Sequence, residues 1–275
     1  MGGARIRYFF HAAYKGTQYH GWQKQPKASS VQETLQKALA TVLKEPVSCI
    51  GCGRTDAGVH ARQYFFHINL NQPLPADFLF IFNKVLPNDI AIFDIFSPPS
   101  RGHAQLSATS RTYDYFVHSQ KDPFLSELSS LYEVSQWDLT AMQKAIAILP
   151  QYNNFRGFCK RPDKHDSTIR QLSLAQLFTN STGDKLQFRF TSSGFLRGMI
   201  RLLVGNILAV GKGKLSVAEW EDCLIQAKSP RFFNLAHPEG LYLSKITYPF
   251  LDLPPKGRFP FELDKTNTHA IQTDV

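Results

Sequence analysis

The hydrophobic and polar positions of the chain follow two periods, which predicts a fold that mixes strands and helices. Residues 4–14, ARIRYFFHAAY, are typical of a strand, whereas the apolar positions after Ser30 recur every three or four residues, as on one face of a helix. Ser30 and Glu33 have the spacing of a helix capping box. The first stretch therefore predicts a strand followed by an amphipathic helix.

The same patterns predict alternating elements along the rest of the chain. Further strands are expected at 47–52, 63–70, 90–96, 109–118, 172–179, 186–191 and 241–248, and further helices at 76–85, 138–149, 194–210 and 217–226. Each half of the chain resembles a split βαβ unit, as in ferredoxin-like folds. The predicted class is α/β (α+β), with two such halves joined into a mainly antiparallel sheet with helices.

A Pro- and Gly-containing stretch, SPPSRGH at 97–103, marks the expected boundary between the halves. We therefore expect an N-terminal α/β half over 1–106, a C-terminal α/β half over 107–250 and an irregular tail over 251–275.

Composition and charge narrow the class of protein. The 275 residues are 43% hydrophobic and 13% aromatic, which excludes disorder of the whole chain. Lys and Arg number 31 against 22 Asp and Glu, a net charge of +9 that both halves share. This indicates a polyanionic partner, most often a nucleic acid, although a basic surface that serves only solubility stays open. Apolar stretches fall short of the ~20 residues of a membrane helix, so we expect a cytoplasmic protein without a membrane partner.

Cysteine and histidine spacings and short motifs show whether the chain carries the signature of a metal or a nucleotide cofactor. Cys49 and Cys52 form a CxxC pair without a second pair, and residues three apart on a strand point to opposite faces, so we expect reduced thiols in the core. The chain contains no phosphate-binding loop and no paired-His motif. The sequence therefore predicts neither a metal nor a nucleotide cofactor.

The segment GCGRTDAGVHA at 51–61 brings three glycines, an Arg, an Asp and a His together within eleven residues, and is the main candidate for a catalytic site. Its glycines predict a turn between two strands, with Asp56 at the apex and Arg54 two residues earlier. A surface turn in which Asp56 bonds local amides is the simplest explanation. Asp56 with His60 could form a base and its orienting partner, but the turn offers no Ser or Cys nucleophile. Asp56 as a nucleophile or base, held ionised by a guanidinium, is the remaining possibility.

Five motifs in order resemble the tRNA pseudouridine synthase A (TruA) family, over about residues 5–250. They are YHGWQKQ at 19–25 with SVQETLQKAL at 30–39, GRTDAGVHA at 53–61, ATSRTYDYFV at 108–117, GFLRGMIRLLVGNILAVGKG at 194–213 and AHPEGLYLSKITY at 236–248. Because each motif is only a hypothesis by itself, the collinear set is what favours the resemblance over a surface turn at Asp56.

The resemblance implies a reaction and a set of site residues. Uridine is isomerised to pseudouridine in the anticodon stem-loop of tRNA, at the expected positions 38–40, without a cofactor. Asp56 would be the catalytic nucleophile, with Tyr113 stacked on the flipped uracil and Leu241 touching it. Arg201 would pair with the carboxylate, and Arg54 would fill the space that the flipped base leaves. Whether the carboxylate attacks C1′ of the ribose or C6 of the base stays open.

The resemblance also implies a homodimer, with an active-site cleft between the two halves of each chain, and the anticodon arm of tRNA as partner. Two alternatives belong to other classes. One is a non-catalytic RNA-binding protein on the same fold, which the combined Asp, Tyr and Arg set disfavours. The other is a hydrolase of glycosidic bonds, which usually needs a second carboxylate that these motifs lack.

Two basic clusters suggest where RNA binds. Lys160, Arg161 and Lys164 belong to a predicted loop at 156–170, and we expect them to contact phosphates without base preference. Arg197 lies four residues before Arg201, so we expect both on one helix face.

The chain departs from the family pattern at a few positions. Gln105 stands where an Arg is frequent, Arg197-Gly198 where the family helix often carries His, and His237 where Pro is frequent. These departures leave the predicted chemistry in place and concern RNA contacts, hence the choice of uridine.

Overall fold

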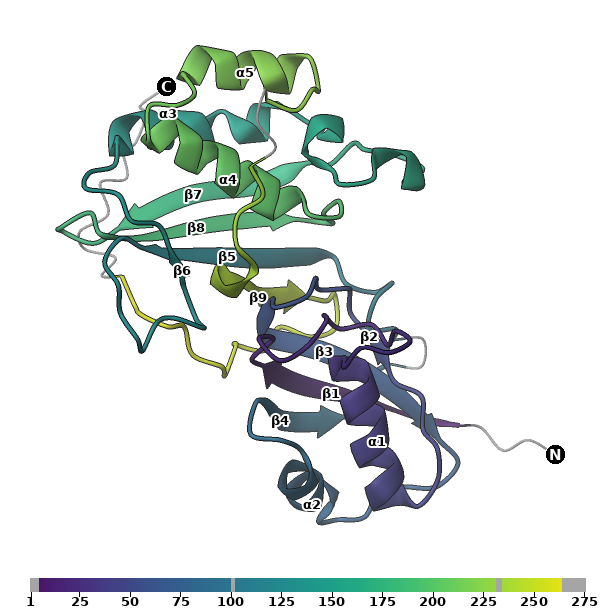
Figure 1. The fold of residues 1–275 in the computed structure, drawn as a ribbon. Helices are drawn as coiled ribbons and strands as arrows, with labels where there is room; N and C mark the ends of the chain where they lie inside the picture. Colours follow the sequence, from purple (N-terminus) through teal and green to yellow (C-terminus); the bar gives the residue numbers. More distant parts are fainter. Residues whose placement is uncertain (1–4, 100–101, 231–233, 264–275) are drawn as a thin grey trace. The chain divides into compact units, whose positions relative to one another are not determined.

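The structure of the chain is a computed structural model, which describes residues 5–99, 102–230 and 234–263 (Figure 1). The chain divides into two compact units: unit 1 is Met1–Arg111 with Tyr242–Arg258, and unit 2 is Thr112–Leu241 with Phe259–Val275. The domain limits expected from the sequence stay a prediction, and residues 264–275 of the expected tail lie outside the described residues.

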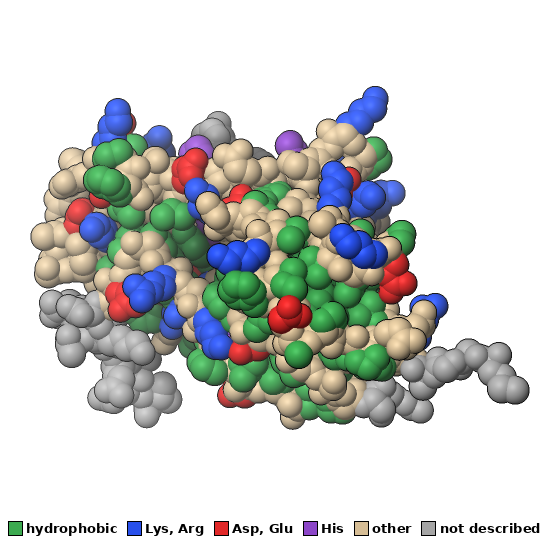
Figure 2. All heavy atoms as spheres, turned by 90° about the horizontal axis from the view of Figure 1, so that it is seen from below, with side chains coloured by type: hydrophobic (Ala, Val, Ile, Leu, Met, Phe, Trp, Pro, Cys, Tyr) green, Lys and Arg blue, Asp and Glu red, His purple; other side chains and the backbone are tan. Residues whose placement is uncertain are grey.

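Hydrophobic side chains form the core of each unit, and among the described residues the Lys and Arg side chains other than buried Arg201 reach the surface. On the face drawn in Figure 2, the basic side chains form several separate groups, with acidic and hydrophobic side chains between them. The positive charge on this face is therefore spread over it and not confined to one patch.

Unit 1 has the strand order of a split βαβ motif. Its strands are β1 (Ile6–Tyr14), β2 (Ile50–Gly51), β3 (His60–Leu70), β4 (Ile90–Phe96) and β9 (Leu241–Thr247), and its helices are α1 (Val31–Leu43) and α2 (Phe78–Val85). The order is β4-β1-β3-β9, with β2 on β3. β1 is antiparallel to β3 and β4, and β2 is antiparallel to β3, whereas β9 pairs with β3 in parallel. The predicted class, a mixed fold with mainly antiparallel strands, is confirmed.

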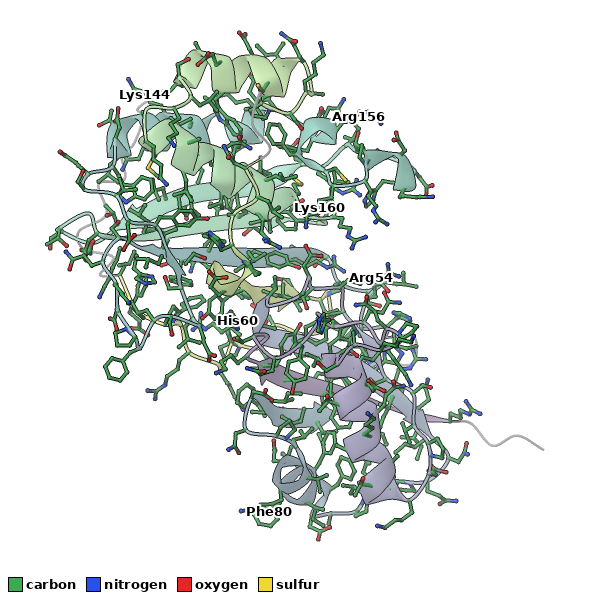
Figure 3. The ribbon with its side chains drawn as sticks, viewed as in Figure 1. Arg54, His60, Phe80, Lys144, Arg156 and Lys160 are labelled. Atoms are coloured by element: carbon green, nitrogen blue, oxygen red, sulfur yellow. The ribbon has the colours of Figure 1, made fainter. Side chains whose placement is uncertain are left out.

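One face of this sheet is covered by helix α2. Phe10 of β1 stacks on Phe66 of β3, with ring centroids 4.6 Å apart, and both rings are fully buried. Phe78 and Phe82 of α2 meet Phe10 edge-on at 6.2 and 6.0 Å. Phe80 lies on the opposite side of the helix and is 67% exposed (Figure 3). The spacing of these Phe residues thus directs α2 onto the sheet.

The other face of the sheet is covered by the segment that follows β9. Phe9, whose side chain points away from Phe10, meets Tyr248 and Phe250 edge-on at 5.8 and 5.9 Å. Because both faces are covered, β1 can be apolar over consecutive residues instead of alternating, which explains the run YFFHAAY in its sequence.

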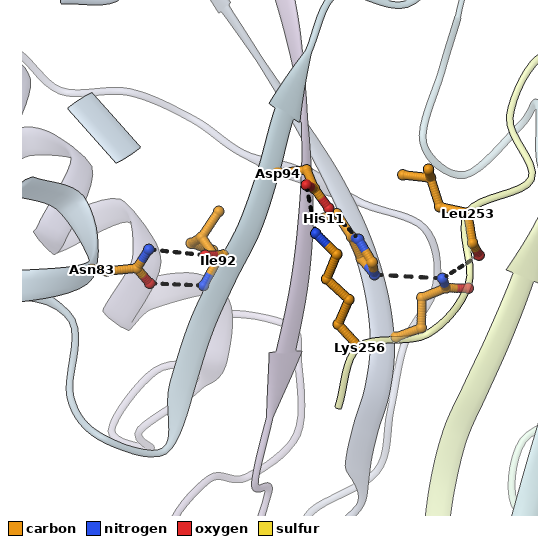
Figure 4. A network of polar contacts seen from close by, with 7 residues as sticks. His11, Asn83, Ile92, Asp94, Leu253 and Lys256 are labelled. Atoms are coloured by element: carbon orange, nitrogen blue, oxygen red, sulfur yellow. Dashed lines mark hydrogen bonds and ion pairs between the residues drawn. The ribbon is translucent and has the colours of Figure 1, made fainter. Parts of the chain in front are cut away.

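A polar network fixes this covering segment (Figure 4). Buried His11 bonds Asp94 through Nδ1 at 2.9 Å, and the Lys256 ammonium reaches the same carboxylate at 2.8 Å. Gln63 donates to the Leu253 carbonyl at 2.9 Å. The segment after β9 is therefore anchored to strands β3 and β4 by specific polar contacts.

Unit 2 contains the βαββα part of the same motif. Its strands are β5 (Ser110–His118), β6 (Ser130–Leu131), β7 (Leu172–Thr179) and β8 (Lys185–Ser192), in the order β5-β8-β7 with β6 on β5. Its helices are α3 (Leu139–Ala147), α4 (Met199–Gly211) and α5 (Val217–Ile225), with short 3₁₀ turns η1 (Leu149–Gln151), η2 (Arg156–Phe158), η3 (Pro162–Lys164) and η4 (Pro238–Gly240). Figure 1 shows the three helices together on one face of β7 and β8.

Two predicted elements are shorter than expected. The helix expected at 194–210 begins at Met199, because Gly198 has a φ of 72°, which a right-handed helix does not accommodate. The strand expected at 47–52 is reduced to β2, which ends at Gly51. At α1 one half of the expected capping box is present: the Ser30 hydroxyl accepts from the Glu33 amide at 3.3 Å. Glu33 itself pairs with Lys37.

The packing of His67 on β3 yields a testable pH dependence. Its Nδ1 accepts from the Ala104 amide at 3.2 Å, and burial, with Arg7 and His103 nearby, lowers its pKa to about 4. An unfolded histidine has a pKa of about 6.5, so the unfolded chain takes up this proton at a higher pH than the folded chain. The free energy of unfolding should therefore fall as the pH falls from about 6.5 to about 4.

His67→Gln keeps an acceptor for the Ala104 amide and does not titrate, so it should make this pH dependence in urea unfolding shallower. His11, His103 and His118, whose pKa burial also lowers, keep their contribution. His20→Gln, at an exposed position, is the control. A wild-type slope in His67→Gln would show that another group causes the loss of stability.

Candidate functional site

Asp56 lies in the loop between β2 and β3, which we call the Asp56 loop (residues 52–59). The loop ends in a turn in which the Val59 amide donates to the Asp56 carbonyl at 3.2 Å. Gly58, the third residue of this turn, has a φ of 75°, which a type II turn requires and glycine adopts without strain. Asp56 is half-buried and Arg54 exposed. The local sequence therefore presents the carboxylate at the start of a defined turn.

The loop is fixed by the segment Gly16–Trp22, which follows β1. The Trp22 amide donates to the Thr55 carbonyl at 3.3 Å, and the Gly58 amide donates to the Tyr19 carbonyl at 3.1 Å. These bonds lie on either side of Asp56, one residue before it and two residues after it. The backbone that carries the carboxylate is thus held at both ends by one neighbouring segment.

Two glycines make this approach possible. A Cβ on Gly21, which has a φ of 89°, would lie 2.2 Å from the Thr55 carbonyl oxygen. A Cβ on Gly16 would lie 2.0 Å from the Val59 carbonyl oxygen. Both distances are far inside van der Waals contact and both neighbours are backbone, so neither position can carry a side chain without moving the loop.

Two buried tyrosines form hydrogen bonds with the Asp56 loop. The Tyr14 hydroxyl bonds the Thr55 hydroxyl at 2.9 Å, and the Tyr64 hydroxyl donates to the Gly53 carbonyl at 2.5 Å. Trp22 stacks on Tyr64 with ring centroids 4.2 Å apart. The loop therefore packs on a cluster of buried aromatic rings, and the tyrosine hydroxyls of this cluster form hydrogen bonds with it.

His60 has a structural role. It is buried, its Nδ1 accepts from the Gly16 amide at 2.9 Å, and its ring lies 4.6 Å from that of Tyr242. The bond to Gly16 thus connects β3 to the segment that holds the Asp56 loop.

Arg111 is a residue of this region that the sequence reasoning missed. Its Nη2 donates to the Cys52 carbonyl at 3.1 Å and to the Gln105 carbonyl at 3.0 Å, joining the Asp56 loop to the loop before β5. Its place in the motif TSRTYDY, two residues before Tyr113, was the available signal. The departure at Gln105 thus leaves the backbone of that loop bonded to Arg111.

The cysteines are free, as expected from their spacing. Cys49 and Cys52 are both buried, and burial raises the pKa of each thiol to about 12. Thiols that stay protonated at neutral pH are poor nucleophiles, so these two serve as core residues.

Tyr113 lies on β5 in unit 2. It is half-buried, and its ring meets that of Phe195 edge-on at 5.2 Å. Its neighbour Asp114 points to the other face of the strand, where it is fully buried and accepts from Gln187 at 2.6 Å and Arg189 at 2.8 Å. Asp114 therefore fixes the strand that presents Tyr113, by contacts on the opposite face.

Arg201 lies in the first turn of α4 and is only 9% exposed. Its Nε donates to the Ala236 carbonyl at 2.6 Å, and the Ala236 amide donates back to the Arg201 carbonyl at 3.0 Å. A Cβ on Gly205, one turn along, would lie 2.0 Å from the Asn234 carbonyl oxygen. The segment before η4 thus lies directly on α4 and sets the orientation of the guanidinium.

Leu241 and His237 flank η4 in the same unit. Leu241 is buried at the start of β9. The His237 carbonyl accepts from the Tyr115 hydroxyl at 2.8 Å, and its amide donates to the Tyr132 hydroxyl at 3.2 Å. The departure at His237 therefore lies in a turn that two tyrosines hold through the backbone.

The basic residues of unit 2 do not share one helix face, contrary to the expectation for Arg197 and Arg201. Arg197 is exposed in the turn before α4, because the helix begins only at Met199, whereas Arg201 is buried. Lys160 is linked to this turn: its amide donates to the Arg197 carbonyl at 3.0 Å, and its stem packs on Gly198, where a Cβ would lie 2.9 Å from it. The glycine thus makes room for Lys160.

The predicted basic loop lies between α3 and β7 and contains η2 and η3. Arg161 and Lys164 are exposed, and Arg156 pairs with Asp163 at 2.5 Å (Figure 3). The loop therefore presents basic side chains to solvent, one of them compensated by a carboxylate.

No helix among the described residues is long and apolar enough to cross a membrane. In the same part of the chain, no group of three or more His, Cys, Asp or Glu side chains has an arrangement that could hold a metal ion.

The comparisons with known proteins agree on one class. Residues 152–249 match a family model described as tRNA pseudouridine synthase. A tRNA pseudouridine synthase A of Porphyromonas gingivalis is 37% identical over 246 residues, which cover 88% of this chain and 97% of that protein. The protein of that name from Bacteroides thetaiotaomicron is 38% identical over 250 residues, covering 88% of this chain and 91% of that protein. The chain belongs to the tRNA pseudouridine synthase A family.

The close approach at Gly21 yields a stability prediction. Gly21→Ala combines an unfavourable positive φ with a backbone clash, and should lower the free energy of unfolding by more than the about 1–3 kcal/mol expected for the φ alone. Gly213→Ala is the matched control, because Gly213 has a φ of 66° and nothing within 4 Å of an added Cβ. Equal losses for the two variants in urea unfolding would contradict the role of the contact with Thr55.

Proposed function

We propose that the chain isomerises uridines of the tRNA anticodon stem-loop, at positions 38–40, with Asp56 as the nucleophile. Membership of the family supports the reaction itself: a tRNA pseudouridine synthase is an isomerase that converts uridine to pseudouridine. The choice of stem-loop and the role of Asp56 go beyond the comparisons. The observation that supports the role of Asp56 is that close glycine contacts and hydrogen bonds on both sides of it fix the backbone that carries this carboxylate.

The chemistry suits a carboxylate that cannot move. The base leaves its bond to C1′, turns and reattaches through C5, so the enzyme must provide an anionic or nucleophilic group at a constant position while the base moves. Asp56 suits this requirement because its backbone is fixed on both sides, by the hydrogen bonds that join Thr55 and Gly58 to the neighbouring segment.

Arg201 and Tyr113 are proposed to complete the site. A guanidinium as buried as that of Arg201 is costly without polar partners, and the Ala236 carbonyl satisfies its Nε. We propose that the same guanidinium pairs with the Asp56 carboxylate during the reaction. Tyr113 has a half-buried ring that can stack on uracil, and Leu241 offers an apolar surface to it. Arg54, which is exposed, would enter the space that the flipped nucleotide leaves.

Partners beyond tRNA are proposals from the family alone. We propose a homodimer, which light scattering of the purified chain tests directly. The exposed residues Arg161 and Lys164, with Arg197 and half-buried Lys160, are proposed to contact phosphates.

Removal of the Asp56 carboxylate should abolish the reaction. With tRNA that carries tritium at C5 of uridine, the wild type should release label, and Asp56→Asn should lower the rate by at least about 10²-fold. Asp77→Asn is the matched control, since Asp77 is an exposed carboxylate of the same unit whose side chain caps nothing. Release at the wild-type rate by Asp56→Asn would overturn its role. Absence of release by the wild type, with tRNA still bound, would favour an RNA-binding protein without catalysis.

We also propose that the Tyr113 hydroxyl helps to remove the proton from C5 of uracil. Two substitutions of Tyr113 separate this role from stacking. Tyr113→Phe keeps the aromatic ring but loses the hydroxyl, so single-turnover release of tritium should slow while the affinity for tRNA stays close to that of the wild type. Tyr113→Leu also removes the ring and should weaken binding of the flipped nucleotide, because stacking on an aromatic ring stabilises a base by about 1–3 kcal/mol. Equal rates for Tyr113→Phe and the wild type would exclude the hydroxyl from proton transfer.

A further inference from the structure

Three lysines line one concave surface of unit 1, which we call the lysine surface. Lys24, Lys27 and Lys37 surround a hollow of about 570 Å³ between the segment after Trp22 and the first turns of α1. Lys24 and Lys27 are exposed, and the Lys37 side chain is 75% exposed. Glu33 also lines the hollow and pairs with Lys37 at 3.4 Å, so the net charge of this surface is positive by two.

The backbone of Lys27 has an unusual conformation for its residue type. A bridge between Gln25 and Ala28 closes a turn in which Pro26 and Lys27 are the central residues, and Lys27 has a φ of 61°. Glycine or asparagine normally takes the third position of such a turn, because a Cβ disfavours a positive φ. A lysine here costs stability that a glycine would not, which points to a use for its side chain.

The other positive-φ residues that are not glycine have an ordinary explanation. Among the described residues these are Lys44 and Ala227. Lys44 is the C-cap of α1, and Ala227 follows the C-cap of α5, where a left-handed residue is a common way to end a helix. Lys27 ends no helix, so this explanation does not apply to it.

The lysine surface is rigidly connected to the Asp56 loop within unit 1. The Lys24 amide donates to the Gln32 side chain at 2.9 Å, and the Gln32 amide donates to the Trp22 carbonyl at 2.9 Å. Trp22 in turn donates to Thr55, the residue before Asp56. The backbone of the lysine surface is therefore connected to the backbone beside Asp56 by a short chain of hydrogen bonds.

We propose that the lysine surface binds the sugar-phosphate backbone of the tRNA whose uridine reaches Asp56. Ammonium groups on flexible stems bind phosphates as point charges and without base preference, which suits an enzyme that must accept different stem sequences. The inference rests on the proposed function for its ligand, because it takes tRNA as the substrate. It adds a binding site in unit 1 to the basic loop expected in unit 2.

Lys27→Asn tests the site without straining the fold. Asparagine adopts a positive φ more readily than lysine, so the variant should be at least as stable as the wild type in thermal unfolding. Its affinity for a full-length tRNA transcript should fall several-fold, and the slope of log affinity against log salt should become shallower by about 1. The variant Lys24→Gln/Lys27→Asn/Lys37→Gln should reduce the slope by about 2–3.

Lys44→Asn is the matched control. Lys44 has the same φ of 61°, is exposed, lies in the same unit and loses the same charge in the variant, but it does not line the hollow. It should leave the affinity and the salt slope close to those of the wild type. Wild-type affinity and slope in Lys27→Asn, or equal losses in Lys27→Asn and Lys44→Asn, would overturn the proposal.

Tritium release by the wild type, measured on the same preparation and the same tRNA, separates this inference from the proposed function. A wild type that binds tRNA but releases no label contradicts the function. An active wild type whose affinity does not depend on Lys27 contradicts the lysine surface alone.

Discussion

The contact between the Gly16–Trp22 segment and the Asp56 loop is the constraint on which the site in unit 1 depends. Two loops meet backbone to backbone, at a distance that leaves no room for a Cβ on Gly16 or Gly21. Hydrogen bonds from the Trp22 amide to the Thr55 carbonyl and from the Gly58 amide to the Tyr19 carbonyl then fix the loop on both sides of Asp56. The backbone that carries Asp56 is therefore positioned by contacts between main-chain atoms.

Unit 2 positions its charged residue by the same physical means. Gly205 allows the backbone of Asn234 to lie against α4, and the reciprocal bonds between Arg201 and Ala236 orient the guanidinium. In each unit, a glycine lies close to the backbone beside a proposed site residue. Gly21 contacts Thr55, next to Asp56, and Gly205 follows Arg201 by one helical turn; an added Cβ would clash with backbone at both glycines. A catalytic geometry that must be accurate to a fraction of an ångström is thus built from backbone contacts, which vary less than side-chain rotamers.

The sequence predicted well what depends on local periodicity. The strand at 172–179 and the capped start of α1 appear as expected, and so does the split βαβ order of unit 1. What it could not predict depends on contacts between distant segments. The late start of α4 follows from the positive φ of Gly198, beside which Lys160 packs. The bonds of Arg111 to two loops, and the hollow lined by Lys24 and Lys37, likewise arise only when separate stretches of chain come together.

The lysine surface and the Asp56 loop are connected by hydrogen bonds through Gln32 and Trp22, but they depend on different atoms of the chain. Binding at the lysine surface would depend on side chains that extend into solvent, whereas the position of Asp56 depends on amides and carbonyls of residues 16–22. The two roles can therefore vary independently, since a lysine can be exchanged without moving a backbone bond. A segment of this kind allows the affinity for the polyanion to change during evolution while the geometry of the carboxylate stays constant.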